Sequence, residues 1–70
     1  MNRIEIGKRL LKLRTDKGLL QHQVAESIGV DKSTIGAYER GYRMPRDDVK
    51  VQLANFYKVD VSGLFYRKEE

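Results

Sequence analysis

The sequence predicts an all-α fold, a compact bundle of about five short helices. Apolar residues recur at helical spacing in successive segments, and Gly or polar turn residues separate these segments. No segment alternates apolar and polar residues with a period of two, so no strand is predicted. The chain has 70 residues, of which 40% are hydrophobic and 34% charged, and it has no Cys. This composition is typical of one small folded domain, which helix packing or self-association must stabilise because no disulfide is available.

The first expected helix covers residues 3–17. Its apolar stripe consists of Ile6, Leu10 and Leu13. Asn2 and Glu5 have the spacing of a capping box at its start, and Gly18 allows a left-handed stop at its end. An amphipathic helix with a signal at each end is therefore predicted here.

Two shorter helices are expected at residues 21–28 and 32–40. Their inward side chains are Val24, Ala25 and Ile28 in the first, and Ile35 and Tyr38 in the second. Gly29 ends the first helix, and Asp31 is expected to cap the second with its side chain.

Residues 41–45 are expected to form an exposed loop, because Pro45 cannot continue a helix. Asp47 and Asp48 favour the N-terminus of a fourth helix that ends near Lys58, and Asp60 is expected to cap a final turn. The predicted core lies within about residues 4–66 of a single domain covering residues 1–70, and residues 67–70 are expected to fray.

The spacing of Gln21, Ala25, Gly29 and Ile35 is more informative than any one of them. Two short helices that cross steeply need a small residue at the crossing, and Ala25 provides it. The turn between them needs a residue that tolerates positive φ, which Gly29 is, and Ile35 packs the second helix onto the first. Together these residues predict a helix-turn-helix.

The sequence resembles the phage repressor and Cro-like (XRE-type) helix-turn-helix regulators over about residues 4–66. The matching residues are Ile6-Gly7-Lys8-Arg9-Leu10, Leu13-Arg14, Gly18-Leu19, Gln21, Ala25, Gly29-Val30, Ser33-Thr34-Ile35, Glu39-Arg40-Gly41, Arg43, Pro45, Leu53-Ala54 and Val59. The resemblance implies a lambda repressor-like DNA-binding domain that recognises double-stranded DNA by sequence. It further implies a repressor that binds a pseudo-palindromic operator as a homodimer.

In this family the third helix enters the major groove, and four residues of that helix face outward on the expected helical phase. The implied base-contacting residues are Lys32, Ser33, Gly36 and Ala37. The expected phosphate-contacting residues are Gln21, Thr34, Arg40, Tyr42 and Arg43. The alternative for Lys32 and Ser33 is a solvated first turn with no ligand.

The resemblance also implies an ion pair between Arg14 and Glu39 that joins the first helix to the end of the third, and the alternative is two unrelated surface charges. A dimer interface is expected in the last apolar segment, and its residues are Val61, Leu64, Phe65 and Tyr66. These residues could equally cover the core of the monomer.

Charge and composition narrow the classes of function. The net charge is +4, which favours polyanionic partners, and most of the excess lies in residues 1–20. With a single His and no Cys, no metal or other cofactor is expected, and no pattern of catalytic residues indicates an enzyme. No membrane or small-molecule partner is expected, and the protein is expected to be cytoplasmic, nucleoid-associated and of bacterial or phage origin.

The alternative function is a protein-interaction module of the same fold. In this interpretation the domain is an antitoxin or binds an antirepressor or other regulatory protein, and DNA contact is secondary. The outward side chains of the third helix discriminate between the two, because polar and basic residues favour DNA, whereas an apolar face would favour a protein groove.

Overall fold

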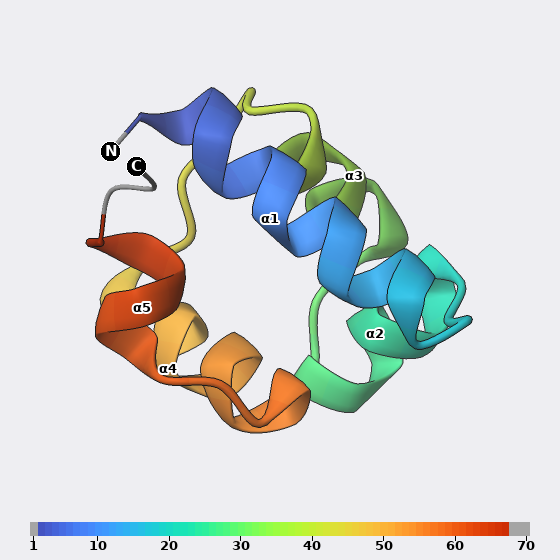
Figure 1. The fold of residues 1–70 in the computed structure, drawn as a ribbon. Helices are drawn as coiled ribbons and strands as arrows, with labels where there is room; N and C mark the ends of the chain where they lie inside the picture. Colours follow the sequence, from blue (N-terminus) through green and yellow to red (C-terminus); the bar gives the residue numbers. More distant parts are fainter. Residues whose placement is uncertain (1, 68–70) are drawn as a thin grey trace.

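The computed structural model describes residues 2–67, which contain five α-helices (Figure 1). These are α1 (Arg3–Asp16), α2 (Gln21–Ile28), α3 (Lys32–Glu39), α4 (Asp47–Tyr57) and α5 (Val61–Phe65). The all-α fold is confirmed, and the expected ends of the first four helices agree within one residue. Of the tail expected to fray, only Arg67 is described, and it is exposed beyond α5; residues 68–70 lie outside the described residues.

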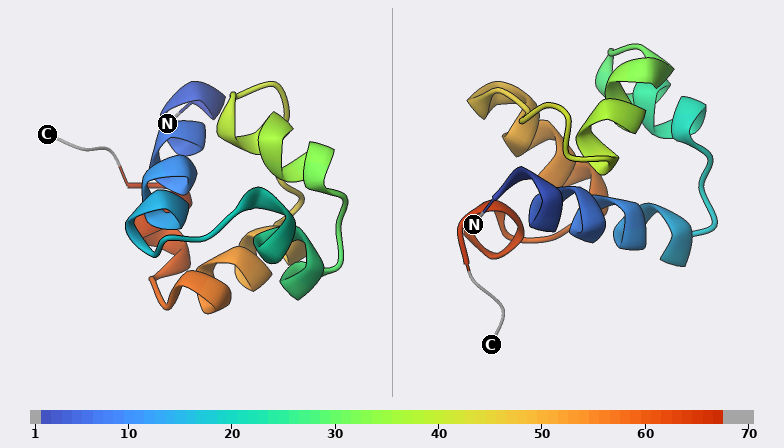
Figure 2. Two further views of the ribbon diagram at one scale, coloured as in Figure 1. Left: turned by 90° about the vertical axis from the view of Figure 1, so that its right-hand side faces the viewer. Right: turned by 90° about the horizontal axis from the view of Figure 1, so that it is seen from above.

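The helices are packed as a closed ring of neighbours. In the order of their principal contacts, α1 packs on α3, α3 on α2, α2 on α4, α4 on α5, and α5 back on α1 (Figures 1 and 2). Side chains from all five helices fill the centre of this ring. The buried hydrophobic residues are Ile6, Leu10, Val24, Ala25, Ile28, Ile35, Tyr38, Val49, Leu53, Ala54, Tyr57, Leu64 and Phe65.

Two of the expected helix caps are present. Asn2 Oδ1 accepts a hydrogen bond of 2.9 Å from the Glu5 backbone N–H at the start of α1. Asp60 Oδ2 accepts from Ser62 Oγ and from the Gly63 backbone N–H at the start of α5. Both hydrogen bonds favour the ionised carboxylate and hold the pKa of Asp60 below its ordinary value. The bond from Ser62 has the larger effect.

The side-chain cap expected at Asp31 is absent, so that prediction is wrong. Asp31 is the N-cap residue of α3, but its side chain accepts no capping hydrogen bond, and only its carbonyl oxygen receives the N–H groups of Thr34 and Ile35. The exposed Asp31 carboxylate therefore remains on the surface beside the first turn of α3.

Close backbone contact fixes α1 against the C-terminal end of α3. A β-carbon added to Gly7 would lie 2.5 Å from the Glu39 carbonyl oxygen and 2.6 Å from that of Tyr38. Gly41, at φ 76°, has the same role one turn away, because its β-carbon would lie 2.9 Å from Ile4 Cα. The two helices approach this closely only because Gly7 has no side chain.

Candidate nucleic-acid interface

The second and third helices form the predicted helix-turn-helix. Gly29 ends α2 in the left-handed conformation at φ 76°, and its N–H donates to the Ala25 carbonyl oxygen at 2.9 Å. Ala25 and Ile35 are 3% and 2% exposed and lie in the core between the helices. The turn and the packing beneath it therefore hold α3 at a fixed angle to α2 (Figure 2, left).

A buried polar cluster links the C-terminal end of α3 to α1, on the side of α3 that faces the protein. Arg14 donates to both carboxylate oxygens of Glu39, through Nε at 2.7 Å and Nη2 at 3.0 Å, and its Nη1 donates to the Leu19 carbonyl oxygen. The side chains are only 13% and 5% exposed. The expected ion pair is thus present, and the hydrogen bond to Glu39 raises the pKa of Arg14.

Gln21 belongs to the same cluster. Its amide Nε2 donates to Glu39 Oε1 at 3.0 Å, so the amide that was expected to reach a phosphate also braces the carboxylate behind α3. Gln21, at the N-terminus of α2, thereby links this helix to the end of α3. The position of α3 depends on side chains from three helices.

The outward face of α3 divides into an open and a covered part. Lys32 and Ser33 in its first turn are exposed, and Thr34 and Ala37 are half-buried. Gly36, expected to be open to a base, is instead buried: a β-carbon there would lie 2.8 Å from Arg40 Nη1. The guanidinium group of Arg40 therefore covers Gly36 on the outward face.

Arg40 and Tyr42 are stacked at the end of α3. The guanidinium carbon of Arg40 lies 5.0 Å from the centre of the Tyr42 ring, within the range of a cation–π contact. Tyr42 is 69% exposed. The two side chains expected to contact phosphates thus form one unit that extends the surface of α3.

A hollow lies beside α3, between the α2–α3 turn and the loop before α4. Its polar lining consists of Thr34 and Arg43, both expected at phosphates, of Arg46, and of the uncapped Asp31 carboxylate. Sequence reasoning missed Arg46, although its place directly after Pro45 in a basic loop was the available signal. Arg46 lies 3.5 Å from Asp48, and both side chains are exposed, so this ion pair is weak and leaves the cation accessible.

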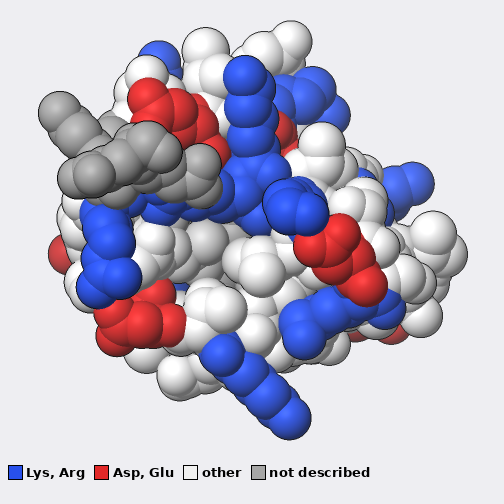
Figure 3. Space-filling view, in the orientation of Figure 1, with Lys and Arg blue, Asp and Glu red and all other residues white. Residues whose placement is uncertain are grey.

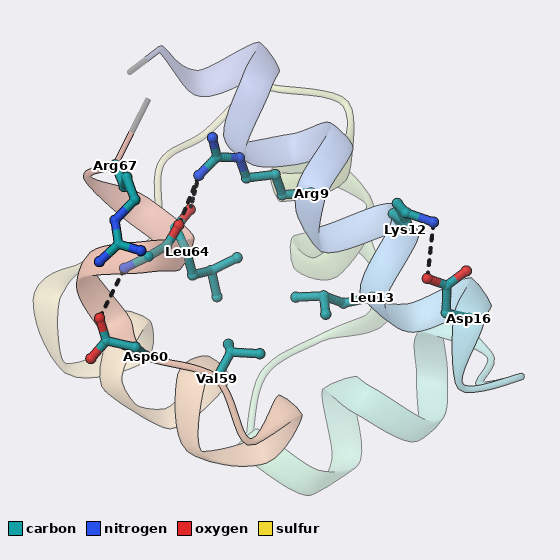
Figure 4. Close-up of a pocket in the computed structure, with 9 residues that line it drawn as sticks. Arg9, Lys12, Leu13, Asp16, Val59, Asp60, Leu64 and Arg67 are labelled. Atoms are coloured by element: carbon teal, nitrogen blue, oxygen red, sulfur yellow. Dashed lines mark hydrogen bonds and ion pairs between the residues drawn. The ribbon is translucent and has the colours of Figure 1, made fainter. Parts of the chain in front are cut away.

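Two of the basic side chains of α1 lie on a different face from the outward side of α3. Figure 3 views the molecule with α1 in front, and α3 lies behind it in the same orientation (Figure 1). Arg9 and Lys12 border a shallow groove between α1 and α5, floored by Leu13, Val59 and Leu64 (Figure 4). Arg9 Nη1 donates there to the Gly63 carbonyl oxygen at 2.8 Å.

The residues expected at a dimer interface fall into two groups. Leu64 and Phe65 are 5% and 2% exposed and belong to the protein's own core, which is the alternative that the sequence left open. Val61 is half-buried and Tyr66 is exposed. Lys50 Nζ donates to Tyr66 Oη at 3.0 Å, so Tyr66 is held on the surface of α4 and α5.

The helices that the structure describes lie within residues 2–67. None of these helices is long and apolar enough to cross a membrane. The same residues hold no group of three or more His, Cys, Asp or Glu side chains placed to bind a metal ion.

Comparisons with known proteins agree with this geometry. A sequence model of the helix-turn-helix family matches residues 10–64. RstR, the cryptic phage CTXphi transcriptional repressor of Vibrio cholerae, is 39% identical over 58 residues, which are 83% of this chain and 52% of RstR. The transcriptional regulator AnsR of Bacillus subtilis is 32% identical over 62 residues, covering 89% of this chain and 53% of AnsR. The chain thus spans about half the length of these relatives.

Two solved structures have a similar fold over most of this chain. The restriction-modification controller protein C.AhdI of Aeromonas hydrophila is 37% identical with a TM-score of 0.81, covering 89% of this chain and 94% of C.AhdI. The DNA-binding domain of BldD from S. venezulae is 34% identical with a TM-score of 0.75, covering 89% and 93% of the two chains. This chain belongs to the Cro/C1-type (XRE) family of helix-turn-helix DNA-binding transcriptional regulators, a non-enzymatic family.

Proposed function

We propose that this protein represses transcription by binding a pseudo-palindromic operator as a homodimer, with α3 of each subunit in the major groove. The observation that carries the proposal is the exposed first turn of α3, on a helix that the Arg14–Glu39 pair fixes from behind. Repression is favoured over activation because RstR is named a repressor and shares 39% identity.

The open part of α3 provides the base contacts in this proposal. Lys32 donates to guanine O6 and N7, Ser33 bonds to one of several bases, and the methyl group of Ala37 contacts a thymine methyl. The polar and basic character of this face favours DNA over a protein groove as the ligand.

Phosphate contacts surround this reading face. Thr34, Arg43 and Arg46 line one hollow and bind a phosphate on one side of α3. Gln21 contacts the backbone from the N-terminus of α2, and Tyr42 contacts it from the loop. Such contacts position α3 without reading sequence.

The homodimer is proposed to form through Val61 and Tyr66, the two expected interface residues that are not fully buried. The proposal requires a two-fold axis at this surface that brings the two α3 helices to one side of the dimer. The half-sites then lie about one duplex turn, roughly 34 Å, apart.

Selection of bound sequences from random duplex DNA tests the proposal. We expect a pseudo-palindrome with half-site centres about 10 base pairs apart. Lys32→Ala should change the preferred base at one or two positions of each half-site, whereas Lys12→Ala, on the opposite face, should select the wild-type sequence. Failure of the wild-type protein to enrich any sequence would contradict the proposal.

A further inference from the structure

Arg40 was expected to contact a phosphate, but the position of its guanidinium group indicates another role. The side chain starts at the C-cap of α3 and runs back along the outward face, so that Nη1 lies 2.8 Å from where a Gly36 β-carbon would be. Helical side chains commonly lean toward the N-terminus in this way. The cation therefore lies one helical turn closer to the first turn of α3 than its own Cα does.

Gly36 makes this position available. Gly within a helix costs about 1 kcal/mol relative to Ala, so its presence in the middle of an eight-residue helix is informative. A β-carbon at Gly36 would be too close to Arg40 Nη1, and it would also lie 3.5 Å from the Gln21 amide nitrogen. The missing β-carbon thus forms a notch that holds the guanidinium group against α3.

The partners of Arg40 leave its hydrogen-bond donors available. Among residues 2–67 Arg40 forms no ion pair with a carboxylate, and its guanidinium carbon lies over the Tyr42 ring, 5.0 Å from the ring centre. A planar guanidinium group held in one place is preorganised to donate two parallel hydrogen bonds. Guanine O6 and N7 in the major groove accept such a pair.

We propose that Arg40 reads a guanine in each half-site and is positioned for this by the Gly36 notch and the Tyr42 ring. This inference rests on the proposed function, because it requires α3 to lie in the major groove. It assigns Arg40 to the specificity-determining residues, and leaves the phosphate contacts beside α3 to the hollow lined by Arg43 and Arg46.

Selections from random duplex DNA with wild-type protein, Arg40→Ala and Arg43→Ala test the proposal. Arg40→Ala should lose the preference for guanine at one position of each half-site, by about tenfold, and keep the other preferences. Arg43→Ala should keep the complete wild-type preference and bind every sequence more weakly. A uniform loss of affinity in Arg40→Ala, or no loss, would overturn the inference.

Gly36→Ala separates positioning from folding. The new methyl group should displace the guanidinium group, so the same guanine preference should fall, while the melting temperature should stay equal or rise because Ala favours the helix. An unchanged preference in Gly36→Ala would show that the notch has no role in reading. If the wild-type protein enriches no sequence, the proposed function fails as a whole, whereas a guanine preference independent of Arg40 contradicts only this inference.

Discussion

Gly7 lies at the point where α1 approaches the backbone of α3 most closely. Its absent side chain leaves room for two carbonyl oxygens at the end of α3, at 2.5 Å and 2.6 Å from the position of a β-carbon. These are backbone atoms of a helix end and cannot rotate away as a flexible side chain would. A substitution here must therefore move α1 or α3 as a whole.

We expect Gly7→Ala to lower the free energy of unfolding by about 1–3 kcal/mol, although Ala favours a helix in general. Gly63→Ala is the matched control, since its β-carbon would have no neighbour closer than 3.9 Å, and it should be neutral or stabilising. Urea denaturation of both variants measures the difference. Equal stability of the two variants would contradict the close approach of α1 and α3.

The Arg14–Glu39 pair also fixes the position of α3, and a substitution of either residue would disrupt it. Both side chains are nearly buried, and Gln21 and the Leu19 carbonyl oxygen complete their hydrogen bonds. Removal of one partner leaves a buried charge without compensation, which is far more costly than the loss of a surface ion pair.

Arg14→Ala should lower the free energy of unfolding by about 3–5 kcal/mol. Lys12→Ala removes the exposed Lys12–Asp16 pair from the same helix and should cost no more than about 0.5 kcal/mol. Chemical denaturation gives both values. A cost for Arg14→Ala as small as that for Lys12→Ala would mean that the pair does not hold α3.

At the scale of elements, α3 and the following loop divide the proposed contacts between them. The first turn of α3 carries exposed side chains of the kind that read bases, whereas Arg43 lines a hollow with Thr34 that suits a phosphate. Base contacts should change the preferred sequence, and phosphate contacts should change only affinity and its salt dependence.

We therefore expect Arg43→Ala to bind all duplex sequences more weakly and to reduce the slope of log affinity against log salt concentration by about one unit. Titrations of operator and unrelated DNA at several salt concentrations measure both effects. Lys12→Ala, which removes a cation on the face between α1 and α5, should keep the wild-type slope. An undiminished slope for Arg43→Ala would remove this residue from the phosphate contacts.

At the scale of the whole molecule, the ring of five helices buries Tyr57 beside the Arg14–Glu39 pair. Burial first, and then the Glu39 carboxylate, raise the pKa of Tyr57 to about 12, above its ordinary value of about 10. Between these two values the unfolded chain has lost the Tyr57 proton while the folded protein keeps it. This contribution to stability is complete below about pH 10 and is lost as the pH rises toward 12.

The free energy of unfolding should accordingly fall by up to roughly 1.4 kcal/mol per pH unit above about pH 10 through Tyr57 alone. Tyr57→Phe should show a flatter decline than the wild-type protein. Urea denaturation from about pH 9 to about pH 11.5 measures both slopes. Parallel declines in the two proteins would contradict the raised pKa of Tyr57.

Local patterns in the sequence determined the five helices, the helix-turn-helix and most of the core. Apolar spacing and Gly signals are read within one helix and its ends, so Ala25, Gly29 and Ile35 were identified from order alone. The resemblance to a family added the Arg14–Glu39 pair, which spans 25 positions and which no local pattern predicts.

Only the tertiary structure decided which residues share a surface. It placed Leu64 and Phe65 in the core, brought Arg46 beside Thr34, and laid Arg40 over Gly36. It also placed Arg9 and Lys12 of α1 at the groove between α1 and α5, away from the outward face of α3, so these two cations do not add to the proposed DNA-binding surface. The physical reason is that helical periodicity fixes which side chains share a face of one helix, whereas the packing of several helices fixes which faces meet and where a long side chain comes to lie.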